Sequence, residues 1–137
     1  MEIELLGPGD ERKVEAASPL FDGPAQEEAT LRFLSDAGHC LLVAYEEGHA
    51  VGFVTGVAMT HPDKGTEMFL YELAVDERFR GHGIGKALVN RLASLAKERG
   101  YYGMWVLTDE DNEAAQATYR GAGGSPQWDQ IVFTWTF

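Results

Sequence analysis

The sequence of 137 residues has a single cysteine and no long apolar run. One cysteine cannot close a disulfide within the chain, and Cys40, in the apolar run 40–44, is expected to be a core residue rather than a nucleophile. No stretch approaches the ~20 apolar residues of a membrane-spanning helix. Residues 1–4 lack the basic and then apolar pattern of a secretion signal. We therefore expect a protein of the cytoplasm with no membrane partner.

Basic residues are scarce as well. The chain has 11 Lys and Arg against 22 Asp and Glu, which gives a net charge of −11. A nucleic-acid partner is not expected, because a protein that binds nucleic acid must neutralise phosphates. The acidic surplus is compatible with ordinary solubility, and it is also compatible with attraction of a polycationic small substrate.

Patterns that hold metals or activate serine are also missing. The four histidines are scattered without the spacing of metal ligands, and no serine lies in a nucleophile-elbow context. We therefore expect no metal site and no serine hydrolase. The histidines are His39, His49, His61 and His82.

The elements that are present fit one α/β domain over residues 1–137, since hydrophobic residues make up 45% of the chain and aromatics 11%. The expected strands are residues 2–5, 40–45, 51–59, 68–75, a short buried strand at 104–107, and 131–137, and the pattern is compatible with one more near residue 127. The expected helices are a short one after Asp10 and those at residues 25–37, 84–99 and 112–122. The third of these has an apolar face formed by Ile84, Leu88, Leu92, Leu95 and Ala96.

Residues 80–86, Arg-Gly-His-Gly-Ile-Gly-Lys, form a glycine-rich turn between an apolar strand and this helix. Such a turn lets backbone N–H groups approach an anion, and the helix N-terminus adds partial positive charge. Arg80, His82 and Lys86 supply further donors, so the turn is typical of a pyrophosphate site. On the glycines alone, a tight turn that needs positive φ stays an alternative. The dinucleotide pattern G-x-G-x-x-G and the nucleotide P-loop both fail here.

What does fit is R-x-x-G-x-G, formed by Arg80, Gly83 and Gly85, and here the chain resembles the GNAT superfamily of N-acetyltransferases. Residues 70–76 are similar to the central strand of that family, and residues 112–119 to a later helix whose asparagine and tyrosine face the cofactor. The resemblance implies acetyl-CoA as cofactor. It also implies a mixed, mostly antiparallel twisted sheet of six to seven strands with about four helices, in which two middle strands splay apart.

The resemblance further implies which residues contact the cofactor. In the family the turn holds the pyrophosphate, and the splayed strand pairs with the pantetheine amides through its backbone. One backbone N–H of that strand polarises the thioester carbonyl, and the asparagine binds the pantetheine arm. The corresponding residues here are Leu73, Ala74 and Val75 in the strand, Arg80, Gly81, His82, Gly83, Ile84, Gly85 and Lys86 in the turn, and Asn112 in the later helix.

Two residues are candidates for proton transfer. Tyr119 lies seven residues after Asn112, which places both on one helical face, and the family position makes it a general acid for the leaving thiolate. Otherwise it is a core tyrosine of an amphipathic helix. Glu72 is the candidate base, directly or through a water, because a carboxylate in an apolar strand is costly to bury unless it is paired or functional. Its alternative is a solvent-facing strand residue, since side chains alternate along a strand.

Acidic loop residues around the expected mouth of the splayed strands are candidates for binding several ammonium groups, although loop carboxylates are commonly just solvated. The candidates are Asp22, Glu67, Asp109 and Asp111. Residues 71–75, Asp109 and residues 115–119 resemble the aminoglycoside 3-N-acetyltransferase branch, which implies acetylation of an antibiotic at its 3-amino group, although Glu72 replaces the usual aspartate. The alternatives are a GNAT enzyme for another amine (a polyamine, a small metabolite, a protein N-terminus or a lysine) and an acyl-CoA sensor without turnover. A homodimer is compatible with the sequence.

Overall fold

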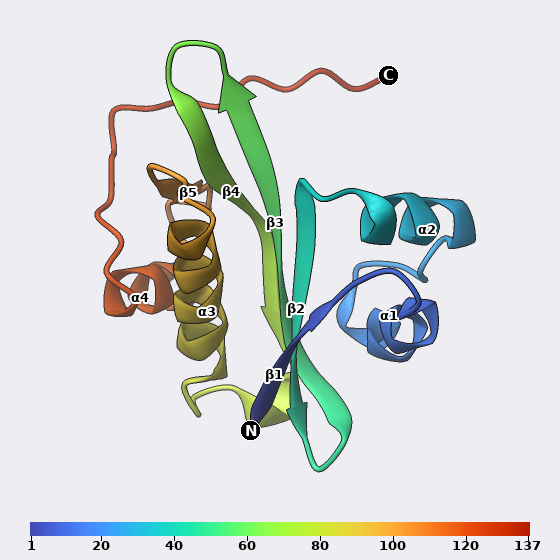
Figure 1. The fold of residues 1–137 in the computed structure, drawn as a ribbon. Helices are drawn as coiled ribbons and strands as arrows, with labels where there is room; N and C mark the ends of the chain where they lie inside the picture. The colour runs from blue at the N-terminus through green and yellow to red at the C-terminus, as the bar shows by residue number, and fades with distance from the viewer.

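The computed structural model describes all 137 residues as one mixed sheet with helices on both faces (Figure 1). The sheet has the order β1-β2-β3-β4-β5, with three antiparallel pairings and a parallel one between β4 and β5. Its strands are β1 (Glu2–Leu6), β2 (His39–Glu46), β3 (His49–His61), β4 (Gly65–Val75) and β5 (Met104–Val106). The helices are α1 (Glu11–Ala17), α2 (Glu27–Ser35), α3 (Ile84–Glu98) and α4 (Glu113–Gly121), with 3₁₀ turns η1 (Ser18–Leu20) and η2 (Glu77–Phe79). No helix has the length and apolarity that crossing a membrane requires.

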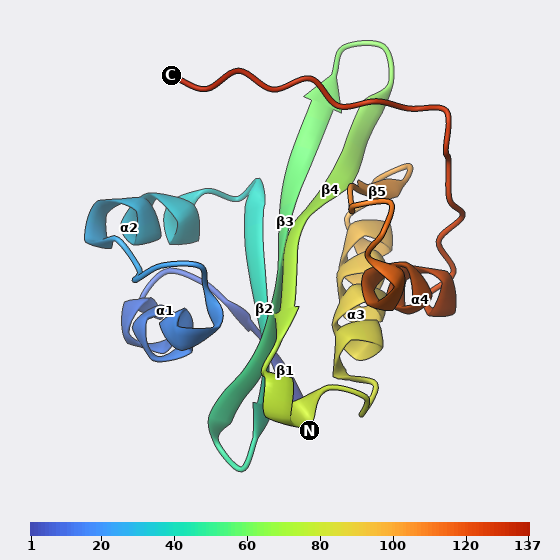
Figure 2. The same cartoon turned by 180° about the vertical axis from the view of Figure 1, so that it is seen from behind.

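The expected fold class and the four helices are confirmed, but the expected six to seven strands are wrong, since the sheet has five. Residues 131–137 form no strand, and neither does the stretch near residue 127. Alternation of apolar residues gives a segment the tendency to form a strand, but a strand exists only when its backbone finds a partner. The C-terminal segment instead leaves α4 and runs outside the body past the tip of the β3–β4 hairpin (Figures 1 and 2).

The two sheet faces carry separate cores. Helix α3, with α4 beside it, covers one face, and α1 and α2 cover the other (Figures 1 and 2). The expected apolar face of α3 is confirmed, because all five of its residues are buried. Complete burial of one such side chain stabilises the fold by roughly 1.5–3 kcal/mol. On the other face, Val14 and Ala17 of α1 and Leu34 of α2 pack on Leu41 and Phe53.

A two-residue turn joins β2 and β3 in a hairpin. Glu46 pairs with His49, and the residues between them, Glu47 and Gly48, have φ of 49° and 80°. Two successive positive φ values give the turn whose twist matches that of the flanking strands. This turn fixes the register of β2 against β3.

A bulge in β4 decides which side chains reach each face. Thr55 pairs with Glu72 but Gly56 pairs with Leu70, so Tyr71 has no partner on β3. Before the bulge Leu70 packs in the core under α3, and after it Leu73 does so. Glu72 and its neighbours at alternate positions therefore point to the face of α1 and α2.

Gly56 is required by packing, and we expect Gly56→Ala to destabilise the protein. A Cβ there would lie 2.6 Å from Met68 Sδ, 3.0 Å from Leu92 Cδ1 and 3.1 Å from Cys40 Sγ, so all three would have to move. Overpacking of this kind costs about 1–3 kcal/mol of unfolding free energy, measurable by urea denaturation. Gly103→Ala is the control, because nothing lies within 4 Å of its Cβ position. Equal stability of the two variants would contradict this account of the core.

Candidate active site

The turn before α3 presents backbone N–H groups instead of a side-chain cap. Gly81 and Gly83 have φ of 81° and 79°, a region that favours glycine, and Gly83 is the N-cap of α3. The first helical bond runs from Ala87 N to Gly83 O at 3.0 Å, so the N–H groups of residues 84–86 have no acceptor within the helix. Together with the partial positive charge of the helix end, they can bind an anion such as a pyrophosphate.

Gly85 has a different task, which is close packing. A Cβ at Gly85 would lie 3.4 Å from Thr118 Cγ2 on α4 and 3.7 Å from Val75 Cγ2 on β4. The start of α3 is thereby held against both the end of β4 and α4. Gly81 and Gly83 therefore allow the backbone conformation of the turn, whereas Gly85 allows α3, β4 and α4 to pack closely together.

Three basic side chains surround this turn, as the sequence predicts. Arg80, His82 and Lys86 are all exposed. Arg80 Nε donates to the carbonyl of Val75 at 3.3 Å, which orients the guanidinium and leaves its terminal nitrogens available. The stem of Lys86 runs beside α4, since a Cβ at Gly121 would lie 3.6 Å from Lys86 Cδ. These contacts keep two long cations close to the open helix end.

Arg78 is not available to bind an anion, because it forms a salt bridge with Asp76. Its Nε donates to Asp76 Oδ1 at 3.1 Å and its Nη2 donates to Oδ2 at 2.7 Å. Its backbone N–H donates to Oδ1 at 2.9 Å. These hydrogen bonds lower the pKa of Asp76 to about 2. The pair closes η2 and fixes the path of the chain from β4 to the turn.

The lower half of β4 is paired on one edge only. Leu73, Ala74 and Val75 pair with β3, while the pairing of β4 with β5 ends where Leu70 meets Val106. Apart from the Val75 carbonyl, which accepts from Arg80 Nε, the edge of residues 72–75 that faces away from β3 therefore has free backbone groups. An extended molecule with amide groups can bind to such an edge as an added strand. β4 is thus unpaired on the side where the splay is expected, and a free strand edge beside the open N-terminus of α3 fits the pantetheine and pyrophosphate of acetyl-CoA.

Glu72 lies at this free edge with a second carboxylate close to it. It is half-buried, and its pKa is raised by loss of hydration and by the negative charge of Asp22. Asp22 comes from the segment between η1 and α2 and is exposed. Neither carboxylate has an ion-pair partner within the chain. Two unpaired carboxylates close to each other can bind an ammonium group.

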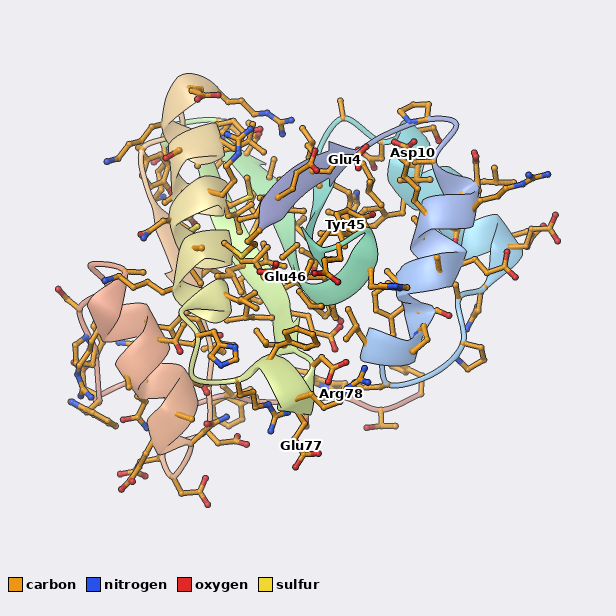
Figure 3. All side chains as sticks on the ribbon, turned by 90° about the horizontal axis from the view of Figure 1, so that it is seen from below. Glu4, Asp10, Tyr45, Glu46, Glu77 and Arg78 are labelled. Atoms are coloured by element: carbon orange, nitrogen blue, oxygen red, sulfur yellow. The ribbon has the colours of Figure 1, made fainter.

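A cleft of about 980 Å³ lies between Asp22 and Arg80, the first residue of the glycine-rich turn. Its walls are the α1–η1 segment, the β2–β3 hairpin and the chain from Ala74 to Arg80. Figure 3 shows this end of the molecule, with Glu46 from the hairpin and Glu77 and Arg78 from η2. Acidic side chains outnumber basic ones along the cleft, which favours a cationic guest in the part away from Arg80.

Tyr119 lies on the opposite face of the sheet from Glu72. Its side chain packs against the core under α3, and burial raises the pKa of its hydroxyl. The phenol therefore stays protonated at neutral pH, as a proton donor must. Because β4 and β5 are separated here, a group held at the free edge of β4 could be approached from both faces.

Asn112 serves as the N-cap of α4. Its Oδ1 accepts from Ala115 N at 3.0 Å, so the helix begins at Glu113, one residue later than expected. The amide nitrogen of Asn112 remains available to a ligand. Asp109 and Asp111 are exposed in the preceding loop, which is tied to α4 by a bond from Gln116 Nε2 to the carbonyl of Asp109 at 3.2 Å.

Glu67 lies apart from the other acidic candidates. It is five residues before Glu72 on β4, which at about 3.3 Å per residue is roughly 16 Å. Its charge acts instead on Tyr102, whose pKa is raised by loss of hydration and then by Glu67. The structure therefore brings Asp22 to Glu72 and leaves Glu67 at the far end of the strand.

The structure has an aromatic cluster near Glu72 that the sequence did not predict. Phe69 and Trp105 have ring centroids 4.4 Å apart, and Phe69 and Tyr71 are 5.7 Å apart. The expectation that residues 104–107 are a buried strand is wrong in part, because the strand ends at Val106 and Trp105 is 38% exposed. The cluster arises from the parallel register that places Phe69 beside Trp105, and single-sequence patterns do not reveal it.

Comparison with known proteins agrees with these features. A model of the acetyltransferase (GNAT) family matches residues 11–123, and the chain belongs to this family, whose members use acetyl-CoA. Human N-acetyltransferase 8B is 29% identical over 109 residues, which cover 79% of this chain and 48% of the human protein. The chain thus spans about half the length of the curated relatives it matches.

Solved structures share the fold at lower sequence identity. An aminoglycoside acetyltransferase, meta-AAC0020 from an uncultured soil metagenomic sample, crystallised with sisomicin, superposes with a TM-score of 0.91 at 23% identity, covering 99% of this chain and 95% of that one. The aminoglycoside N-acetyltransferase AAC(6')-Iy in complex with CoA gives a TM-score of 0.82 at 18% identity, covering 99% of each chain. These likenesses concern the fold.

We expect Gly83→Asp to weaken acetyl-CoA binding much more than Gly83→Asn. Both side chains tolerate positive φ and can cap the free N–H groups of α3, but only Asp adds a negative charge where the pyrophosphate would bind. The charge alone should lower the affinity at least about tenfold, measured by titration calorimetry. Equal affinities of the two variants would mean that no phosphate binds at this turn.

Proposed function

We propose that this protein transfers the acetyl group of acetyl-CoA to an amino group of an aminoglycoside antibiotic and so confers resistance. The 3-amino group is the expected position, because the sequence resembles the 3-N branch around Glu72 and Asp109. The fold neighbour AAC(6')-Iy carries a different position in its name, so the position is part of what must be measured.

The observation that carries the proposal is the pair of unpaired carboxylates, Glu72 and Asp22, beside an open aromatic surface. Aminoglycosides are compact sugars with several ammonium groups, so they need acidic partners for the amines and flat apolar partners for the ring faces. The first need is met by the carboxylate pair and the acidic cleft. The exposed faces of Tyr71 and Trp105 meet the second.

Binding of acetyl-CoA in this proposal uses both halves of the site. When bound, the coenzyme supplies an acetyl group activated as a thioester. The N–H groups of residues 84–86, with Arg80 and Lys86, hold its phosphates, and the free edge of residues 73–75 aligns its amide-containing arm. This anchoring at two places fixes the acyl end near Glu72.

Glu72 and Tyr119 then handle the protons. Glu72 takes one proton from the acceptor ammonium, because an amine attacks a carbonyl carbon only through its free lone pair. The raised pKa of Glu72 makes the carboxylate a better base than an exposed one. As the new amide forms and the carbon–sulfur bond breaks, Tyr119 gives its proton to the departing thiolate. The nitrogen of the new amide loses its second proton to solvent, and Tyr119 regains its proton from solvent.

A second candidate acceptor is another amine, such as a polyamine, a small metabolite or a peptide amine. It is favoured by the sequence relatives, since human N-acetyltransferase 8B matches most of this chain and is not named as an aminoglycoside enzyme. Carboxylates recognise all such cations, and the aromatic surface is what favours a ring-shaped acceptor.

The decisive test is a screen for acetyl-CoA-dependent thiol release. We expect sisomicin, gentamicin and fortimicin to give turnover with kcat/KM at least about a hundredfold above that of spermidine, peptides with a free N-terminus or an unmodified lysine, or simple amino acids. NMR of the product identifies the acetylated nitrogen. Turnover with a polyamine or peptide alone would replace the first proposal by the second, and tight acetyl-CoA binding without any turnover would reject both.

The role of Glu72 can be separated from simple ammonium binding by Glu72→Gln. If Glu72 is the base, kcat should fall about 10²–10⁴-fold near neutral pH. The loss should shrink as pH rises, because more of the acceptor amine is then already deprotonated. A rise in KM with unchanged kcat would show that Glu72 only binds the acceptor.

Asp22→Asn is the matched variant, since it removes the neighbouring charge and keeps the base. Asp22 raises the pKa of Glu72, so its neutralisation should lower that pKa. The acid limb of the pH profile of kcat/KM should therefore move to lower pH, with a higher acceptor KM. An acid limb that stays in place would mean that Glu72 does not control it.

A further inference from the structure

The face of β4 and β5 on the Glu72 side of the sheet is not covered by a helix. Helices α1 and α2 lie on this side, but they pack mainly on β2 and β3. In both views α2 stands beside β2 and well apart from β5 (Figures 1 and 2). The side chains that β4 and β5 present on this side are therefore open to a ligand.

Aromatic side chains form the middle of this open face. Phe69 lies opposite Trp105 in the parallel register, and the ring of Tyr71 reaches Phe69 from the bulge. On the other side of Phe69, Val57 of β3 is its partner and adds an apolar side chain to the same face. A saturated ring can bury its C–H groups against such a surface.

A carboxylate lies at each end of this aromatic surface. Glu72, with Asp22 near it, marks one end, and Glu67 marks the other. Glu67 is half-buried and, like Glu72, forms no ion pair within the chain. Tyr102 lies close enough to Glu67 for the charge to raise its pKa, but a neutral phenol does not compensate a negative charge. Each end of the surface therefore favours a cation.

We infer that Glu67 determines acceptor specificity by binding a second amine of the acceptor, on a ring other than the one that is acetylated. The acceptor then lies along β4, with the reacting amine at Glu72 and a ring on the aromatic side chains between the two carboxylates. This inference rests on the proposed aminoglycoside acceptor. It adds the direction in which the acceptor lies and the residue that selects for its length.

The length of the surface sets the length of the acceptor. Glu67 and Glu72 both point to this face, and their backbone positions are roughly 16 Å apart along β4. A charge-assisted hydrogen bond of about 2.8 Å at each carboxylate leaves roughly 10 Å between the two nitrogens that are held. Two amines of one six-membered ring are closer together than this, so the second amine belongs to another ring.

The surroundings of Glu72 favour an acetylated amine in the middle of the acceptor. The aromatic surface lies on one side of Glu72, and the cleft that begins at Asp22 lies on the other. A compound of three rings can therefore bind with its central ring at Glu72. In gentamicin the 3-amino group is on the central ring, and the outer ring attached farther from it carries a methylamino group. We assign that group to Glu67.

The first experiment compares gentamicin with its two-ring fragments as acceptors for Glu67→Gln. Garamine keeps the central ring and the ring with the methylamino group, whereas gentamine lacks that outer ring. We expect Glu67→Gln to raise KM about tenfold for gentamicin and garamine and to leave KM for gentamine unchanged. We expect kcat to stay the same for all three, because Glu67 is far from the reacting atoms.

Glu98→Gln is the matched control, since it removes the same charge from an exposed residue of α3 on the other side of the sheet. It should change none of the three KM values. An unchanged KM for gentamicin in Glu67→Gln would overturn the inference and leave the proposed function standing, and so would an equal rise with all three acceptors or a rise with gentamine alone. If the wild-type protein acetylates no aminoglycoside, the proposed function falls and the inference falls with it.

The second experiment tests the aromatic surface without turnover. Trp128 and Trp135 are both exposed, so replacing each by Phe spares the core and leaves Trp105 as the single tryptophan. In the presence of CoA, we expect gentamicin and garamine to change the fluorescence of Trp105 in a saturable way, and gentamine to change it far less. A Trp105 signal that does not respond to gentamicin would overturn the placement of a ring on this surface.

Discussion

The site depends on a strand that is hydrogen-bonded on one edge only. β4 lies in the middle of the sheet, where both edges of a strand are normally paired, yet beyond Leu70 it has β3 alone as a neighbour. Unpaired backbone groups in the middle of a protein are costly unless water or a ligand satisfies them. The unpaired edge can therefore bind a molecule with amide groups. The neighbouring turn likewise has free N–H groups, which can bind phosphates.

Electrostatics divide this site into two regions of opposite character. Around the start of α3, Arg80 and Lys86 create a local basic region in a strongly acidic chain. At Glu72 and Asp22, a few residues away along β4 and the η1–α2 segment, carboxylates stand without counterions. An anionic coenzyme and the cationic acceptor that we propose would thus be drawn to adjacent places, and each would be repelled from the place of the other.

Local sequence signals predicted the parts of the structure that local physics decides. The α3 face follows from helical periodicity, and the tight turn before α3 follows from its glycines, two of which have positive φ. The predictions failed where a partner far away in the sequence decides the outcome. Alternation at residues 131–137 could not tell whether a neighbouring strand exists, and the exposure of Trp105 depends on its pairing with Phe69. The sequence named both Asp22 and Glu67 as acidic candidates for the site. It could not show that Asp22 lies near Glu72 while Glu67 does not, because that depends on the tertiary structure.

The bulge at Tyr71 acts as a shift in the reading frame of β4. Upstream of it, even-numbered positions such as Leu70 face α3, and downstream odd-numbered positions such as Leu73 do. If the same residues ran on without the bulge, regular alternation from Leu70 would turn the rest of the strand over. The carboxylate of Glu72 would then point into the apolar core under α3, and Leu73 would point to the other face. The face on which Glu72 lies is therefore encoded by one extra residue in the strand as much as by the identity of its neighbours.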